Sequence, residues 1–93
     1  MKRLLLRSPS FSRDLRRWLK RRPETATAIQ TALDNISEDS ANPILRVHPL
    51  KGPLVGCLAC SAGYDVRIVF EYAKHAGAEA VRLLALGTHE EVY

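Results

Sequence analysis

Four polar residues stand where apolar segments of the sequence begin or end: His48, Asp65, Arg67 and His89. A histidine with an unperturbed pKa of about 6.5 can give or take a proton near neutral pH, and a carboxylate can also act as a base. A guanidinium supports negative charge on phosphate oxygens. An acid, a base and an arginine together suit phosphodiester cleavage, in which one group deprotonates the attacking oxygen and another protonates the leaving oxygen.

The same residues indicate which phosphodiester would be cut. No cluster of metal-binding carboxylates is visible in the sequence. We therefore expect the ribose 2′-OH to be the internal nucleophile, which restricts the substrate to RNA and requires neither a metal nor a cofactor. Both His48 and Asp65 are candidates for the base. Each residue also has a purely structural interpretation, such as a surface charge pair between Asp65 and Arg67 worth about 0–1 kcal/mol.

The segments that position these residues follow from hydrophobic periodicity. A short strand over residues 2–6 precedes two helices separated by Pro23, which form an α-helical hairpin. An extended stretch at 44–49 leads to three strands over 54–61, 65–72 and 80–86, whose short links require antiparallel pairing. The expected order is β-α-α-β-β-β, an α+β fold with the helical hairpin packed on a small antiparallel sheet.

Length and composition set the class of protein. The 93 residues, 46% hydrophobic and 26% charged, predict a single domain over 1–93 with one modest core. No apolar run approaches the roughly 20 residues that a membrane span needs. The apolar run at 4–6 is also shorter than the about 7–15 residues of a signal-peptide core, which favours a cytoplasmic protein.

Positive charge is concentrated in the first half of the chain. Residues 1–51 hold eleven Lys/Arg and five Asp/Glu, a balance of +6, whereas residues 52–93 hold three and five, a balance of −2. Four basic residues recur at helical spacing on the first helix: Arg13, Arg16, Arg17 and Lys20. Such a face suits a polyanion such as nucleic acid, or an acidic protein. A solvated helix face is the alternative interpretation.

Cys57 and Cys60 form a C-x-x-C pair, but no second pair of ligands with similar spacing follows for zinc. A redox-active pair usually begins a helix after a strand. Here the predicted strand at 54–61 would point the two side chains to opposite faces of a sheet. We therefore expect both cysteines to be buried and reduced.

Three segments resemble the RelE/ParE toxin superfamily, and in particular its YafQ-like mRNA interferases from bacterial toxin–antitoxin modules. They are His48-Pro49-Leu50-Lys51-Gly52, Tyr64-Asp65-Val66-Arg67-Ile68-Val69-Phe70, and Gly87-Thr88-His89 with Tyr93. The resemblance covers nearly the whole chain and implies a RelE-like fold. It also implies an endoribonuclease that cuts mRNA in the ribosomal A site, leaves a cyclic phosphate and a 5′-OH, and inhibits translation until a cognate antitoxin neutralises it. The implied partners are ribosome, mRNA and antitoxin, with no membrane and no DNA bound by the toxin alone.

The resemblance also implies roles for individual residues. His48 matches a histidine in base or proton-relay work, and Asp65 matches the active-site carboxylate. Arg67 matches the phosphate-stabilising arginine, and His89 matches the general acid. Tyr93 matches a terminal aromatic residue that stacks on or positions the nucleotide. The residues expected to contact RNA and the ribosome are Arg13, Arg16, Arg17, Lys20 and Lys51.

One position departs from the pattern of the YafQ-like enzymes, because Ser61 stands where they carry a further histidine. Serine cannot shuttle a proton near pH 7, so the acid–base set is reduced. Two other functions therefore stay open. The chain could be a non-enzymatic gyrase inhibitor like the ParE branch, or a catalytically degenerate homologue that only binds an antitoxin.

Overall fold

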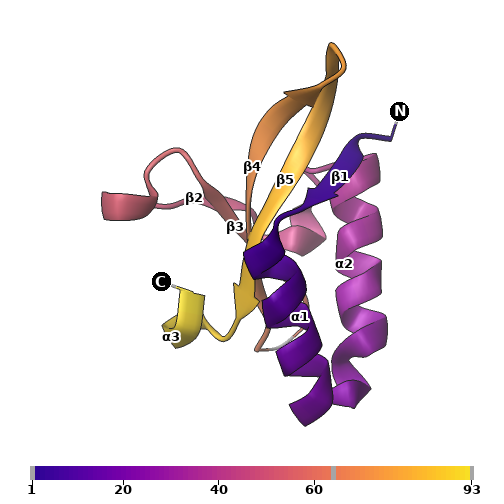
Figure 1. Cartoon of the computed structure of the whole chain (residues 1–93), viewed down its shortest axis with the longest axis vertical. Coiled ribbons are helices and arrows are strands. Elements are labelled where there is room, and N and C mark those ends of the chain that lie inside the picture. Colours follow the sequence, from indigo (N-terminus) through magenta and orange to yellow (C-terminus); the bar gives the residue numbers. More distant parts are fainter. Residues whose placement is uncertain (1, 64, 93) are drawn as a thin grey trace.

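The computed structural model describes residues 2–63 and 65–92 and has an α+β fold (Figure 1). Its elements in chain order are β1 Leu4–Arg7, α1 Pro9–Arg21, α2 Ala26–Glu38, β2 His48–Pro49, β3 Leu58–Ser61, β4 Arg67–His75, β5 Ala78–Gly87 and α3 His89–Val92. Three 3-10 helices lie between them, at Pro23–Thr25, Pro43–Leu45 and Gly52–Leu54. Figure 1 shows α1 and α2 on one side of the strands and α3 on the other.

The predicted helical hairpin is confirmed. The Ser8 hydroxyl accepts a hydrogen bond from the Phe11 amide at 3.1 Å and caps α1, and Pro9 occupies its first turn. Phe11 and Trp18 from the apolar stripe are buried. Pro23 then opens the short 3-10 helix from which α2 begins, because proline suits a first helical turn and not a helix interior.

The sheet has five strands in the order β1-β5-β4-β3-β2. The pairs from β5 to β2 are antiparallel, but β1 pairs parallel to β5. The sheet is therefore mixed, and the expectation of an antiparallel sheet holds only for its last four strands. A parallel pair needs a long connection, and here nearly the whole chain lies between the two strands. The two-residue strand β2 was not predicted.

Several predicted boundaries were wrong for local reasons. Leu54 belongs to a 3-10 helix, so β3 is shorter than the predicted strand at 54–61. The stretch at 44–49 is not extended throughout, because Pro43–Leu45 forms a 3-10 helix. The link between β4 and β5 is only Ala76-Gly77, both at positive φ (53° and 82°), a combination found in two-residue hairpins.

Apolar side chains cover both faces of the sheet. The main core packs α1 and α2 against the sheet through Phe11, Trp18, Ile36, Ile68, Phe70 and Leu83, with other residues. A smaller cluster covers the opposite face and contains Leu50, Ala59 and Val69, with Leu84, Ala85 and Val92 packed against it. This second face, which we call the outer face, carries the candidate active-site residues described below.

The two cysteines lie in different clusters, as strand alternation predicts. Cys60 is fully buried in the main core, whereas Cys57 is half-buried on the outer face, so the expectation of burial holds fully only for Cys60. Burial raises the pKa of the Cys60 thiol to about 12. We expect an alkylating agent at pH 8 to modify Cys57 and to leave Cys60 unmodified in the folded protein. Peptide mass mapping checks this result, and equal labelling of both cysteines under native conditions would contradict it.

Candidate active site

Arg67 lies at one end of the outer face, where the ends of three strands meet. It begins β4 and lies directly opposite Ser61 of β3 on one side and Gly87 of β5 on the other. Residues opposite each other in an antiparallel pair point to the same face, so small neighbours flank the long arginine side chain. The guanidinium is partly buried, and its Nη1 donates to the Val66 carbonyl at 3.2 Å. This arrangement holds a positive charge at the end of the sheet.

His48 lies on the edge strand of the same sheet. It is exposed and pairs with Ala59, which in turn pairs with Val69. Two interstrand spacings and a shift of two residues separate His48 from Arg67, which is about 10 Å across the sheet and about 7 Å along it. A nucleotide can lie between two side chains at this separation.

The hydrogen bonding of His48 defines which ring nitrogen can act as a base. Its Nδ1 lies 3.1 Å from the Arg46 carbonyl oxygen. A carbonyl oxygen only accepts hydrogen bonds, so Nδ1 carries the proton and donates it. In the neutral ring the lone pair is then on Nε2, which is the form that a general base requires.

His89 is exposed and begins α3, immediately after β5. Two contacts fix the direction of the chain here. The Leu86 amide donates to Asp14 Oδ2 of α1 at 3.2 Å, which anchors the end of β5. The Val92 amide donates to the Thr88 carbonyl at 3.1 Å, and the Val92 side chain packs against the outer-face cluster. α3 therefore packs on the outer face, on the side of the strands opposite α1 and α2 (Figure 1).

The sequence predicted that Asp65 lies on the same strand as Arg67, but Asp65 lies outside β4. The Ala62 amide donates to the Val66 carbonyl at 2.8 Å, and Gly63 adopts a φ of +86°, so the chain turns tightly between β3 and β4. Asp65 lies in this turn and is exposed. The hydrogen bond that Arg22 donates to the Glu24 carboxylate chiefly raises the pKa of Arg22, and the negative charge of Asp65 adds to this effect. Asp65 therefore lies close enough to the end of α1 to interact with Arg22.

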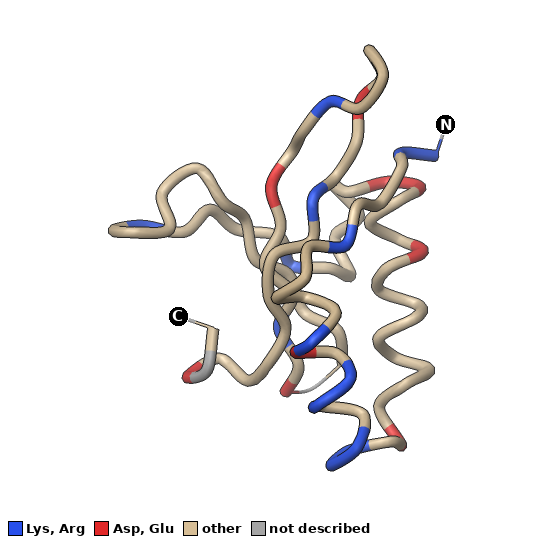
Figure 2. Tube along the Cα trace, viewed as in Figure 1, with Lys and Arg blue, Asp and Glu red and all other residues tan. Residues whose placement is uncertain are grey.

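The predicted basic residues are all exposed. Arg13, Arg16, Arg17 and Lys20 project from α1, and Lys51 lies in the loop after β2. Figure 2 shows positive charge gathered along α1 and at its lower end, away from the negative charges on α2. Positive charge of this kind attracts a polyanion.

Sequence analysis missed two arginines that extend this basic surface. Arg21 and Arg22 place their guanidinium carbons 5.5 and 5.7 Å from the centre of the Trp18 ring. Together with Thr88, the three residues line a cavity of about 290 Å³. The basic surface thus reaches the residue that precedes His89. The sequence signal for them was a pair of arginines shortly after Trp18 at the end of the helix, because arginine side chains can stack on a tryptophan ring.

Three further expectations concern Tyr93, metal ions and membrane spans. Tyr93 lies outside the described residues. Within 2–63 and 65–92, no group of three or more His, Cys, Asp or Glu could hold a metal ion. In that part of the chain, no helix is both long and apolar enough to cross a membrane.

Comparison with protein-family models and with curated protein sequences finds no match. Solved structures, however, match over the whole chain. A metal-bound toxin from Helicobacter pylori has a TM-score of 0.74 at 25% identity, covering 100% of both chains. YafQ from E. coli strain BL21(DE3) has a TM-score of 0.71 at 19% identity, covering 99% of each chain. The toxin of the E. coli DinJ–YafQ toxin–antitoxin complex has a TM-score of 0.69 at 20% identity, covering 100% of this chain and 99% of that chain.

The chain has the fold of the RelE-like toxin superfamily, so the resemblance stated from sequence is confirmed. The YafQ and DinJ–YafQ structures share this fold at 19–20% identity.

Proposed function

We propose that the protein is a ribosome-dependent endoribonuclease that cleaves mRNA, acts as the toxin of a toxin–antitoxin module and inhibits translation. One observation carries the proposal most directly. Arg67 begins the central strand β4 at one end of the outer face, His48 lies on the edge strand of that face, and His89 begins the helix that folds onto it. A protein that only blocks gyrase has no need of two histidines around an arginine.

The proposed reaction needs only the RNA and these side chains. Nε2 of His48 removes the proton from the ribose 2′-OH, and the 2′ oxygen attacks the adjacent phosphorus. The Arg67 guanidinium stabilises the negative charge that grows on the phosphate oxygens. His89, in its protonated form, gives its proton to the departing 5′ oxygen as the P–O5′ bond breaks. The products are a 2′,3′-cyclic phosphate and a 5′-OH.

The base is assigned to His48 and not to Asp65. The Arg46 carbonyl fixes the His48 tautomer with a lone pair on Nε2, whereas Asp65 lies in the β3–β4 turn and acts electrostatically on Arg22. Asp65 therefore balances the charge of the basic surface at the end of α1. A histidine base on the sheet also keeps the base and Arg67 on one surface.

The position of Ser61 suggests how the activity could be raised. Ser61 pairs directly with Arg67, so a histidine there would add a titratable group beside the guanidinium. We expect Ser61→His to raise the cleavage rate, by up to about 10²-fold, the lower end of what a positioned acid–base group supplies. Single-turnover cleavage of a ribosome-bound message measures the change. Ser61→Gln is the matched control for size, and an equal gain in that variant would contradict an acid–base role.

Two partners follow from the proposal. The exposed residues Arg13, Arg16, Arg17 and Lys20, with Lys51, would contact RNA on the ribosome through phosphate groups. A cognate antitoxin would neutralise the toxin, as the DinJ–YafQ complex structures support. A protein with these two partners would act in the cytoplasm.

Induced expression in cells tests the proposed function. We expect growth to stop because protein synthesis stops, and we expect co-expression of the antitoxin to restore growth. Incorporation of labelled amino acids should fall before incorporation of labelled thymidine. Intact translation together with DNA damage would contradict the proposal and favour a ParE-like gyrase inhibitor. Antitoxin binding without any effect on growth would favour a degenerate toxin homologue.

A further inference from the structure

A pocket of about 410 Å³ lies on the β2–β3 loop, which runs over residues 50–57. Among the residues that the structure describes, its lining consists of three apolar side chains and one lysine: Leu50, Pro53, Leu54 and Lys51. Figure 1 shows the loop extending from the sheet on the side away from α1 and α2. The proposed reaction uses none of the three apolar side chains, so the pocket has no role in it so far.

The register of the strands places this pocket on the outer face, beside His48. His48 pairs with Ala59, and the Leu50 amide donates to the Cys57 carbonyl at 3.0 Å, which continues the same pairing by two residues. Leu50 and Ala59 both belong to the outer-face cluster, so His48 points to that face as well. Residues i and i+2 of a strand share a face and lie about 7 Å apart. The pocket therefore begins one side-chain spacing from the proposed general base.

Hydrogen bonds within the loop hold the pocket in shape. The Val55 amide donates to the Gly52 carbonyl and the Cys57 amide to the Leu54 carbonyl, both at 3.0 Å. Gly52 and Gly56 adopt φ angles of +69° and +94°, which glycine reaches without strain and which these tight turns require. The Leu54 side chain packs against the outer-face cluster. A pocket that is already formed loses less conformational freedom when a ligand binds.

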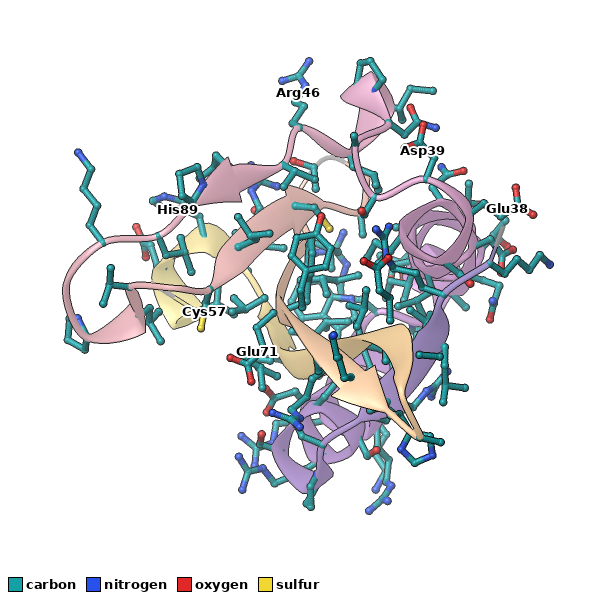
Figure 3. The ribbon with its side chains drawn as sticks, turned by 90° about the horizontal axis from the view of Figure 1, so that it is seen from above. Glu38, Asp39, Arg46, Cys57, Glu71 and His89 are labelled. Carbon is teal, nitrogen blue, oxygen red and sulfur yellow. The ribbon has the colours of Figure 1, made fainter. Side chains whose placement is uncertain are left out.

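The covalent structure of RNA indicates what would enter the pocket. In the proposed reaction, His48 contacts the 2′-OH of the nucleotide on the 5′ side of the cut, and His89 contacts the 5′ oxygen of the next nucleotide. Figure 3 shows His89 on the side of the molecule from which the loop extends. The nucleobase of the first nucleotide is attached to C1′, which is bonded to C2′, so it stays within one ribose of His48. Nucleobases are held between apolar side chains and read at their polar edges.

We propose that this pocket holds the nucleobase on the 5′ side of the cut and so helps to select the codon that is cleaved, an inference that rests on the proposed cleavage function. Leu50 and Leu54 contact one face of the nucleobase. The Lys51 ammonium donates a hydrogen bond to an acceptor on its edge, because an ammonium group has donors and no acceptor. A mostly apolar pocket with one polar group suits a flat ligand of this kind.

Removing the nucleobase from the message tests this proposal. Two ribosome-bound messages are compared that differ only in the nucleotide on the 5′ side of the cut, which is normal in one and an abasic ribose in the other. We expect Leu54→Ala to lower kcat/KM on the normal message about tenfold, the effect of losing apolar contact in a specificity pocket. On the abasic message the same variant should change kcat/KM by less than about twofold, because the contact is already absent.

Val55→Ala is the matched control, because Val55 is 76% exposed in the same loop and lies outside the pocket lining. It should keep the wild-type rate on both messages. Pro53→Ala is a second pocket variant that trims an exposed side chain, and it replaces Leu54→Ala if thermal melting shows that variant to be unfolded. An equal fall on both messages, or the same fall in Val55→Ala, would overturn the nucleobase pocket and leave the cleavage function intact. No cleavage by the wild-type protein would instead contradict the proposed function itself.

Discussion

Replacing His89 by alanine is expected to slow mRNA cleavage by about 10²–10⁴-fold, the range for removing a positioned acid–base group. The reason is that no proton donor would then reach the departing 5′ oxygen. His89 is exposed at the start of a four-residue helix, so the free energy of unfolding should change by no more than about 0.5 kcal/mol. Single-turnover cleavage of a ribosome-bound message measures the rate, and chemical denaturation measures the stability.

His75 provides the control for this substitution. It is also an exposed histidine, but it ends β4 at the hairpin next to Ala76-Gly77, at the opposite end of the strand from Arg67. His75→Ala should keep the full cleavage rate. An equal loss of activity in both variants would point to a general effect of removing a histidine and would contradict the acid role of His89.

Replacing Arg67 by alanine is expected to lower the cleavage rate by about 10²–10³-fold, as is typical when one group that stabilises transition-state charge is removed. The substrate affinity should change far less, because the charge that Arg67 meets grows mainly in the transition state. Arg67→Lys keeps the charge but loses the two-pronged geometry, so it should recover only part of the rate. The split between kcat and KM measures this difference.

The competing explanation for Arg67 is structural. The guanidinium donates to the carbonyl of Val66, the residue just before β4, so alanine could loosen the start of this strand. Thermal unfolding of both variants separates the two effects. A fall in the melting temperature of Arg67→Ala that accounts for the lost activity, with kcat restored on cooling, would refute the phosphate-stabilising role.

The helical hairpin and the strands β3, β4 and β5 could be predicted from sequence, because their signals are local. Apolar spacing on α1 and α2, Pro23 between them and alternation in the strands each act within a few residues. The place of Arg67 at one end of the sheet also followed, because short links bring the ends of neighbouring antiparallel strands together.

The features that were missed depend on contacts between distant segments. The parallel pairing of β1 with β5 joins Leu4 to Ala80, and no local pattern indicates it. The predicted strand position of Asp65 was wrong because the chain turns before β4 begins, where the Ala62 amide donates a hydrogen bond to the Val66 carbonyl.

Mapping of new 5′ ends on a translated message tests the central claim most directly. Primer extension is run on mRNA from a translating extract that contains wild-type toxin, beside a sample that contains His89→Ala. We expect wild type to produce new 5′ ends within the coding region, carrying 5′-OH groups, only when ribosomes translate the message. The variant should produce few or none. Cleavage by both proteins alike, or no cleavage by wild type on a translated message, would contradict the account.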